Sequence, residues 1–216
     1  MARIIKENNS NCIRESCNAL NKGGIIIIPT VRWYMITTRA DNEGGVSAIF
    51  AAKDRDRSRQ PLFVVPRKET IKSYFQVDEF SEKIIKRLMP GEITLRMLWL
   101  DPEKSRPFSV NHDNALVYAA SGIFGRIARE IGFPLAATTP NVSSDDNMGP
   151  ALSVLEAKRF ITGTKVPVDI IIDGGLSVVS NNTTIVDSRN IGEKHLIERK
   201  GYVNSRVIDR VQMDNI

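Results

Sequence analysis

The sequence has few of the residues on which metal sites, disulfides and histidine-dependent catalysis depend. Only two of its 216 residues are cysteines, and only two are histidines. Cys12 and Cys17 would lie on diverging faces of a helix, and neither belongs to a CxxC pair. His112 and His195 are far apart along the chain. We therefore expect reduced cysteines, no metal-binding residues and no histidine-activated nucleophile, as in a cytoplasmic protein.

The sequence also lacks the apolar segments that membrane proteins and exported proteins carry. The isoleucine run at 25–28 is far too short to span a bilayer. The N-terminal segment has no apolar stretch of the length found in signal peptides. These features predict a cytoplasmic location and no membrane partner.

The composition is that of an ordinary globular protein with a small excess of positive charge. Hydrophobic residues make up 42% and charged residues 25%, and the length suffices for a sizeable core. Lysine and arginine number 30 against 25 acidic residues, which gives a net charge of +5 and a pI near 9.3. This excess favours anionic partners, but it does not distinguish a nucleic-acid-binding protein from an enzyme that binds a phosphorylated ligand.

Short β-type segments alternate with segments of helical periodicity along the whole chain. No linker, composition shift or internal repeat divides it, so the pattern predicts a single α/β domain over residues 1–216 around a central sheet. Strands are expected at 25–28, 62–65, 93–100, 115–120, 135–138, 168–173, 184–187 and 195–199, and helices at 11–22, 43–53, 78–89, 121–131, 151–161 and 204–212.

Basic residues alternate with other residues in the segment 51–62, at the end of an expected helix. They are Lys53, Arg55, Arg57 and Arg59. If the segment is extended, all four side chains point the same way and form a positive strip that could bind a triphosphate or an RNA backbone. Asp54 and Asp56 neutralise half of this charge, so a solvated loop is the other interpretation.

Further segments place hydroxyl, amide or arginine side chains at strand ends, where open α/β sheets usually bind ligands. The polar residues in question are Thr30, Arg32, Tyr34, Thr138, Thr139, Asn141, Ser143, Ser144, Thr183, Thr184 and Arg199. Such side chains can bind phosphate or sugar oxygens. They also cap their own backbone in ordinary turns, so none of these segments decides the function alone.

The order of the segments is more informative than any one of them. The sequence has no GxxxxGK[ST] loop, no GxGxxG fingerprint and no HExxH pair. It does have a strand ending in Pro-Thr, then Lys-x-Arg before Pro-Leu, Pro-Gly-x-x-Thr, Thr-x-Asn-x-Ser, Thr-Ile-Val-Asp and x-Arg-x-Gly. Over residues 12–202 this series resembles the YrdC-like family, whose best-known members are threonylcarbamoyl-adenylate synthases of tRNA modification.

The resemblance implies a twisted, open mixed sheet flanked by helices, with a positively charged concave face. It implies a nucleotidyltransferase that joins L-threonine, bicarbonate and ATP into threonylcarbamoyl-AMP and releases pyrophosphate, with Mg²⁺ assisting. The product would serve the formation of N6-threonylcarbamoyladenosine in tRNA, together with other tRNA-modification proteins acting downstream.

The family motifs match individual positions of this chain. Lys53 and Arg55 match the Lys-x-Arg pair that contacts nucleotide phosphates, and the resemblance makes them the expected catalytic residues. The residues expected to bind the nucleotide are Thr30, Tyr34, Thr139, Asn141 and Arg199. The residues expected to bind the other substrates are Arg32, Thr183 and Thr184, of which the two threonines match a Ser-Thr pair of the family.

The chain departs from the family on the amino-acid side of the site. The family's first motif runs P-T-[ED]-T-x-Y-G-L, whereas residues 29–36 read PTVRWYMI. Ala120 occupies the place of an arginine that would pair with the amino-acid carboxylate, and no hydroxyl can replace a bidentate guanidinium. Arg32 is the candidate that would restore this charge from another strand.

Three functions are therefore left open by the sequence. The first is the threonylcarbamoyl-AMP synthase. The second is a non-catalytic or differently specific relative that binds tRNA, double-stranded RNA or a nucleotide through a basic concave face. The third is adenylation of carbamate or carbamoyl phosphate, as in YrdC-like domains of carbamoyltransferases, which the absence of a transferase module disfavours.

Overall fold

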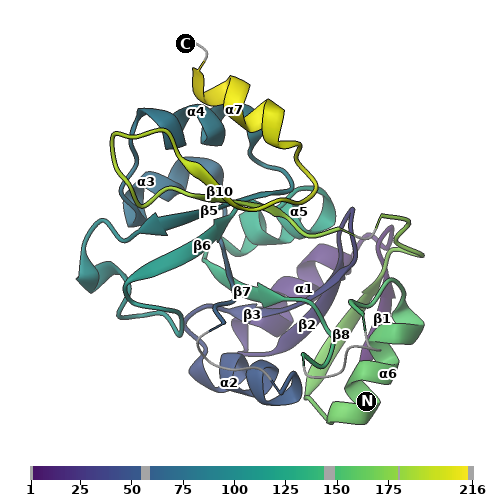
Figure 1. The fold of residues 1–216 in the computed structure, drawn as a ribbon. Coiled ribbons are helices and arrows are strands. Elements are labelled where there is room, and N and C mark those ends of the chain that lie inside the picture. Colours follow the sequence, from purple (N-terminus) through teal and green to yellow (C-terminus); the bar gives the residue numbers. More distant parts are fainter. Residues whose placement is uncertain (1, 55–58, 144–148, 180, 214–216) are drawn as a thin grey trace.

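The computed structural model describes residues 2–54, 59–143, 149–179 and 181–213 around one long mixed sheet (Figure 1). The strands of this part of the chain are β1 (Arg3–Lys6), β2 (Ile25–Pro29), β3 (Tyr34–Arg39), β4 (Leu62–Val64), β5 (Ile93–Leu98), β6 (Asn114–Tyr118), β7 (Leu135–Thr138), β8 (Val168–Asp173), β9 (Thr184–Asp187) and β10 (Leu196–Arg199). They lie in the order β1-β8-β2-β3-β7-β4-β6-β5-β9-β10. Parallel and antiparallel pairs are both present, which confirms the expected open, mixed sheet.

Helices cover both faces of this sheet. They are α1 (Cys12–Asn21), α2 (Glu43–Ala52), α3 (Ile71–Tyr74), α4 (Glu79–Leu88), α5 (Gly122–Ile131), α6 (Val154–Thr164) and α7 (Ser205–Met213), with short 3-10 turns η1 (Lys68–Thr70) and η2 (Pro102–Lys104). Asp78 caps α4 through a hydrogen bond from the Ser81 amide, and Gly132 ends α5 in the left-handed conformation. No helix in the described ranges is long and apolar enough to cross a bilayer.

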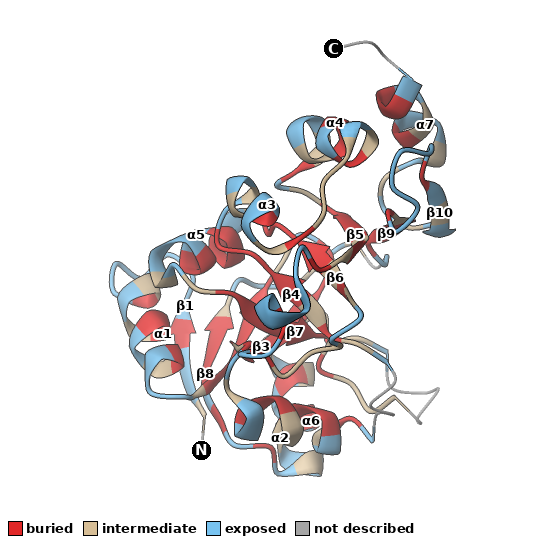
Figure 2. Cartoon of the chain, turned by 90° about the vertical axis from the view of Figure 1, so that its left-hand side faces the viewer, coloured by how far each residue is buried: buried red, intermediate tan, exposed pale blue. Residues whose placement is uncertain are grey.

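Strand β2 shows how the sequence builds two buried faces. All of its residues are buried, and successive isoleucines point to opposite sides of the sheet. Ile26 and Ile28 pack with α1 and α5, whereas Ile25 and Ile27 pack with α2 and α6. Figure 2 shows the buried strands between these two helix pairs. A continuous apolar run is typical of a strand covered on both sides.

The other half of the sheet is covered chiefly on the α2 face. Alternate residues of β5 and β6 pack there against α3, α4 and α7. Phe63 of β4 lies at the centre of an aromatic group in edge-to-face contacts with Phe75, Trp99 and Phe108. The opposite face of β4 and β6 extends past α1 and α5, and the candidate site lies there.

The expected strands and helices are present, with ends shifted by a few residues. The largest shift is in α6, which begins at Val154 instead of residue 151 because Ser153 caps it. The sequence analysis missed β1 and β3. No strand was expected between residues 28 and 62, but a tight turn returns the chain as β3, antiparallel to β2 with Pro29 opposite Tyr34.

Candidate functional site

A small polar cavity lies on the sheet face that α1 and α5 share, beyond the ends of those helices. Its volume is about 110 Å³. Leu62, Leu116 and Ala137 form its floor on β4, β6 and β7. The remaining lining residues come from turns and from β3, β7, β9 and β10: Arg32, Trp33, Met35, Gln60, Thr138, Thr139, Asn182, Thr183, Ile185 and Arg199. Four of the predicted site residues, Arg32, Thr139, Thr183 and Arg199, therefore meet at one cavity.

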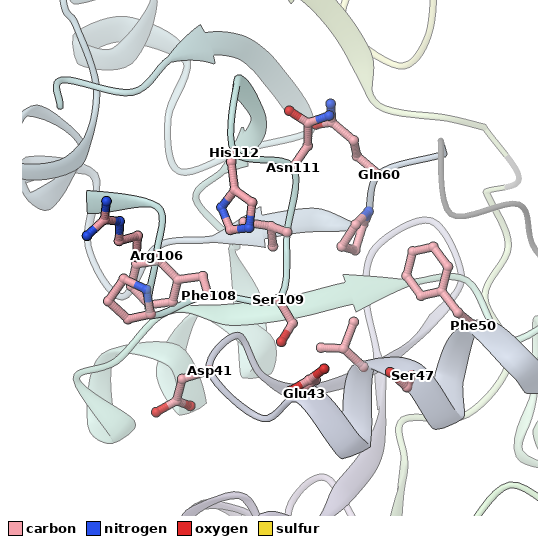
Figure 3. A pocket seen from close by; sticks show the side chains of 14 residues that line it. Asp41, Glu43, Ser47, Phe50, Gln60, Arg106, Phe108, Ser109, Asn111 and His112 are labelled. Atoms are coloured by element: carbon pink, nitrogen blue, oxygen red, sulfur yellow. The ribbon is translucent and has the colours of Figure 1, made fainter. Parts of the chain in front are cut away.

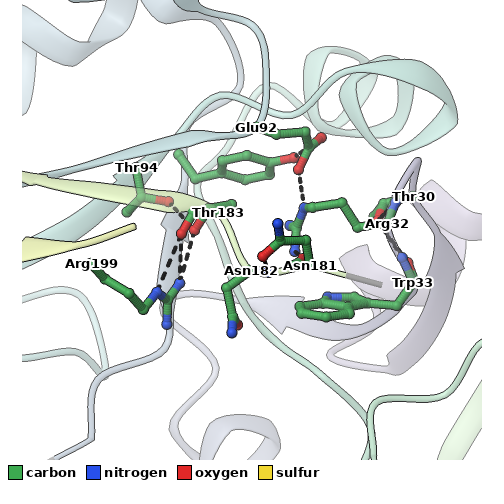
Figure 4. A network of polar contacts seen from close by, with 10 residues as sticks. Thr30, Arg32, Trp33, Glu92, Thr94, Asn181, Asn182, Thr183 and Arg199 are labelled. Atoms are coloured by element: carbon green, nitrogen blue, oxygen red, sulfur yellow. Dashed lines mark hydrogen bonds and ion pairs between the residues drawn. The ribbon is translucent and has the colours of Figure 1, made fainter. Parts of the chain in front are cut away.

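Arg199 and Thr183 form one wall of this cavity. Nη2 of Arg199 donates to the Thr183 carbonyl at 3.0 Å and to its hydroxyl oxygen at 3.1 Å. The Thr94 hydroxyl donates to the same Thr183 oxygen at 2.9 Å (Figure 4). The antiparallel pairing of β9 with β10 brings these residues together. Burial lowers the pKa of Arg199, and the Arg32 guanidinium lowers that pKa further, so the two cations share one site.

Lys53 organises the turn that carries Thr139 and Asn141. Its ammonium donates to the Thr139 carbonyl at 2.5 Å, to the Asn141 carbonyl at 2.7 Å and to Asn141 Oδ1 at 3.0 Å. The Thr139 hydroxyl donates to the same Oδ1 at 2.7 Å. The sequence therefore selected three residues that meet in space. The Lys53 side chain is fully buried at the end of α2, where it bonds to this turn.

Arg32 lies on the tight turn between β2 and β3 and is almost completely buried, with 2% of its surface exposed. Its Nε forms an ion pair with Glu92 Oε2, and its Nη1 donates to the Asn181 carbonyl at 3.2 Å. The Tyr118 hydroxyl donates to Glu92 Oε1 at 2.9 Å. Burial, with Glu92 adding to it, raises the pKa of Tyr118, so this hydroxyl stays a donor. The guanidinium also lies 4.9 Å from the centre of the Trp33 ring (Figure 4).

The sequence analysis did not identify Glu92, Tyr118 or Trp33 as parts of the site. Glu92 is 60 residues from Arg32, so no local spacing links them. Glu92 could have been identified from its position, because a carboxylate stands there directly before the apolar strand β5. A charged group in such a place needs a partner when the strand is buried.

Three predicted residues serve the fold instead of lining the cavity. The Thr30 hydroxyl closes the β2–β3 turn by donating to the Trp33 carbonyl at 2.6 Å. The Tyr34 hydroxyl donates to the Gly175 carbonyl at 2.7 Å and accepts from the Gly174 amide. The Thr184 hydroxyl donates to the Val203 carbonyl at 2.7 Å. Arg55, with Arg57 and Ser144, lies outside the described residues.

A larger cavity of about 510 Å³ lies on the opposite face of the sheet, between α2 and the loop 106–112 (Figure 3). Phe50 and Phe108 line it together with Asp41, Glu43 and other polar residues. It contains none of the predicted site residues. The larger cavity is lined by Arg106, Ser47 and Ser109 as well, so the smaller one is distinguished by the predicted residues that meet there.

The chemistry of the site is that of anion binding. Two guanidinium groups and several hydroxyl and amide groups surround the small cavity, whereas one buried carboxylate, Glu92, offsets their charge. In the ranges that the structure covers, no group of three or more His, Cys, Asp or Glu side chains could hold a metal ion. The arrangement suits a ligand rich in oxygen acceptors.

The profile of the Sua5/YciO/YrdC family, described under the heading telomere recombination, matches residues 18–201. The chain belongs to this family. All the lining residues of the small cavity fall inside the matched range. The Sua5/YciO/YrdC match thus includes both the predicted and the newly found residues of the site.

Known members of the Sua5/YciO/YrdC family resemble this chain in sequence and in fold. A Methanocaldococcus jannaschii protein, whose name gives threonylcarbamoyl-AMP synthase as an inferred activity, is 28% identical over 166 residues, which are 76% of this chain and 74% of the relative. P. abyssi Sua5, solved as a double variant and with L-threonine, gives TM-scores of 0.83 and 0.80 at 23% and 21% identity.

Both Sua5 structures match 98% of this chain, but only 64% and 60% of their own chains, so this chain spans less than two thirds of the length of that relative. E. coli YciO gives a TM-score of 0.77 at 17% identity, over 94% of this chain and 98% of YciO. The structural matches confirm the predicted fold.

Proposed function

We propose that this chain is an ATP-dependent enzyme that forms threonylcarbamoyl-AMP from L-threonine, bicarbonate and ATP. The observation that carries the proposal is the convergence of Arg199, Thr183, Thr139 and Arg32 on one cavity, with Lys53 and Asn141 bonded directly behind Thr139. Family membership supports it, as do the name of the M. jannaschii relative and the presence of L-threonine in a P. abyssi Sua5 structure.

The reaction joins two condensations. The amine of L-threonine takes up bicarbonate to give a carbamate, with loss of water. A carbamate oxygen then attacks the α-phosphorus of ATP, and the bond to the β-phosphate oxygen breaks. The products are threonylcarbamoyl-AMP and pyrophosphate. Such a transfer needs alignment of the reactants and cations that stabilise the leaving pyrophosphate, and it needs no nucleophilic side chain.

The side chains of the site suit these tasks. The guanidinium of Arg199 donates to the Thr183 hydroxyl oxygen, and we propose that it also binds a phosphate of the nucleotide. Thr183 orients the reactants beside it. Lys53 is a positioning residue, because its ammonium fixes the turn of Thr139 and Asn141. For Arg55, contact with the nucleotide phosphates remains a prediction.

Mg²⁺ would reach this site with the nucleotide. The donor set of the cavity consists of arginines, hydroxyls and amides, which make a poor cage for a hard divalent cation. Mg²⁺ usually retains several waters and binds substrate phosphates. The ion would neutralise phosphate charge, and no residue of the described chain is assigned to it.

Pyrophosphate release tests the proposal. The protein should release pyrophosphate when ATP, bicarbonate and L-threonine are all present, and omission of any one should abolish release. Arg199→Met should raise the KM for ATP about tenfold or more, as expected for a charge-assisted hydrogen bond. Arg189→Met is the matched control, because Arg189 is half-exposed, pairs with Asp187 and lines neither cavity.

Lys53→Met tests the positioning role. Loss of the ammonium should lower kcat and weaken ATP binding while the protein still folds, because the turn of Thr139 loses its anchor. Absence of pyrophosphate release from the wild type, together with salt-sensitive binding of tRNA, would instead favour a non-catalytic RNA-binding relative.

A further inference from the structure

A short series of hydrogen bonds leads from the interior of the sheet to Arg199. The Thr94 hydroxyl on β5 donates to Thr183 Oγ1 at 2.9 Å, and the same oxygen accepts from Arg199 Nη2 at 3.1 Å (Figure 4). Thr94 and Thr183 are both buried, whereas Arg199 retains exposed surface. The series therefore joins a residue that lines neither cavity to the wall of the small cavity.

The hydroxyl group of Thr94 serves Thr183. Thr94 is fully buried in β5, and a buried hydroxyl needs a hydrogen-bond partner. Within the described ranges, this hydroxyl forms one hydrogen bond, to Thr183. Valine has nearly the same shape and suits a buried strand position well. The polar group at position 94 is therefore explained by its bond to Thr183 and not by the packing of the strand.

Thr183 in turn fixes the plane of the Arg199 guanidinium. Nε and Nη2 of Arg199 both donate to the Thr183 carbonyl, at 3.3 and 3.0 Å, and Nη2 also donates to Thr183 Oγ1. A guanidinium is a rigid planar group, so the positions of two nitrogens fix the direction of the third. Nη1 forms no hydrogen bond with any described residue, and it is therefore the nitrogen left for an acceptor group of a ligand.

The chain that follows β10 lies against the same segment of the cavity wall. The Tyr202 amide donates to the Asn182 carbonyl at 2.8 Å. A Cβ atom on Gly201 would lie only 2.6 Å from the Thr183 carbonyl oxygen, so a glycine is needed for this close approach of two backbones. Two independent features, a buried hydroxyl group and a glycine, thus bring Arg199 and Thr183 together.

We propose that Thr94 is a positioning residue, which holds the Thr183 hydroxyl so that Arg199 presents Nη1 to a phosphate of the nucleotide. This inference rests on the proposed function and adds to it a residue that touches no substrate. Without the Thr94 hydroxyl, Thr183 loses one of the two bonds that fix its side chain, and the guanidinium keeps its charge but loses its fixed direction. A purely structural role of Thr94 would lower stability and leave nucleotide affinity unchanged.

Calorimetric titration of the full chain with ATP tests the proposal. Thr94→Val removes the hydroxyl and keeps the shape of the side chain, and it should weaken ATP binding about fivefold, the effect of one neutral hydrogen bond. Thr94→Ser keeps the hydroxyl and should bind ATP as the wild type does. Thr37→Val is the matched control, because Thr37 is equally buried in a strand, donates to the Ala136 carbonyl at 2.9 Å and lines neither cavity. This control should leave ATP binding unchanged.

A double-mutant cycle shows whether Thr94 acts through Arg199. In the Arg199→Met background, Thr94→Val should cause no further loss of ATP affinity, because the guanidinium that Thr94 positions is absent. The same loss in both backgrounds would mean that Thr94 affects the cavity by another route, and would overturn the proposal. Equal losses in Thr94→Val and Thr94→Ser, or wild-type affinity in Thr94→Val, would overturn it as well.

The binding measurement also separates this inference from the proposed function, because it needs no turnover. If the wild type releases no pyrophosphate but the cycle couples Thr94 to Arg199, the positioning role is supported and the proposed reaction is wrong. If pyrophosphate is released and the cycle shows no coupling, the inference fails and the proposed function stands. Inorganic pyrophosphate serves as a second probe. If the wild type binds neither ATP nor pyrophosphate, Arg199 has no phosphate to bind and the inference fails.

Discussion

Two buried networks of this protein join an acid to a base, and they differ in whether they lie beside a cavity. Arg32 and Glu92 lie beside the small cavity, and the spare nitrogen of Arg32 belongs to a side chain that lines it. Asp78 and His195 join α4 to the segment before β10, with Nε2 of His195 3.0 Å from Asp78 Oδ1. His195 lines neither cavity described above.

The side chains of the second network form hydrogen bonds with backbone groups. Asp78 accepts from the amides of Ser81 and Gly192, and Gln212 of α7 exchanges hydrogen bonds with both the amide and the carbonyl of His195. These contacts tie two helices and a loop together. A buried acid–base pair is thus no sign of function by itself. The first pair differs in that Arg32 lines a cavity that also contains other predicted site residues.

The largest effect should come from breaking the first pair. Glu92→Gln leaves the Arg32 charge buried without a counter-charge, and we expect the free energy of unfolding to fall by about 3–5 kcal/mol. Arg32→Met/Glu92→Met removes both charges and should recover most of that loss. Urea denaturation measures both values. An equal loss in the double variant would contradict the view that the pair is held for ligand binding.

A smaller effect should follow in the second network. Asp78→Ala removes the cap of α4 and the partner of His195, and we expect the free energy of unfolding to fall by about 1–2 kcal/mol. L-Threonine binding and pyrophosphate release should stay at wild-type levels. Loss of either at a temperature where the variant is folded would show that the two networks are coupled.

The same carboxylate gives a prediction for pH. Burial alone would raise the pKa of Asp78, but hydrogen bonds from Ser81 and Gly192 and the nearby His195 lower it below its usual value. The folded state therefore binds this proton less readily than the unfolded state. The resulting stability is present above the unfolded pKa of about 3.9 and is lost as the pH falls through the folded pKa. Urea midpoints measured from pH 5 downward should converge for wild type and Asp78→Asn.

The smallest effect should come from Tyr118. Tyr118→Phe removes one hydrogen bond to Glu92 and keeps the ring, so the free energy of unfolding should fall by about 1 kcal/mol. If Tyr118 positions Arg32 through Glu92, the KM for L-threonine should rise about threefold while the KM for ATP stays constant. Parallel changes in both constants would mean a general disturbance of the cavity.

Much of the fold could be predicted because local patterns and tertiary structure agree. The isoleucines of β2 indicate a strand buried on both faces, and Asp78 marks the start of α4. Strand β3 was missed because its register depends on the turn that Thr30 closes with its own side chain. Strand β1 was missed because it is an edge strand with one buried residue, Ile5, and so has no clear hydrophobic pattern.

The site was predictable only where neighbouring residues act together. Thr139 and Asn141 are two residues apart and share one hydrogen bond, so their turn is visible in the sequence. Arg32 was predicted because its charge could replace that of the arginine missing at position 120. Its partner Glu92 comes from another part of the chain, and only the folded sheet reveals which nitrogen that carboxylate leaves unused. No sequence pattern indicates that the indole N–H of Trp33 is buried without a hydrogen-bond partner.

The strand order also has a consequence for the timing of assembly. Strand β9 pairs in parallel with β5, although residues such as Ile93 and Thr184 that face each other are far apart in the sequence. It places Ile185 at the cavity beside Thr183. Arg199 enters still later, on β10. A chain emerging from the ribosome therefore has no complete cavity until Arg199 has been synthesised. Non-local pairings of this kind form slowly, so we expect the cavity between Arg32 and Arg199 to close late in folding.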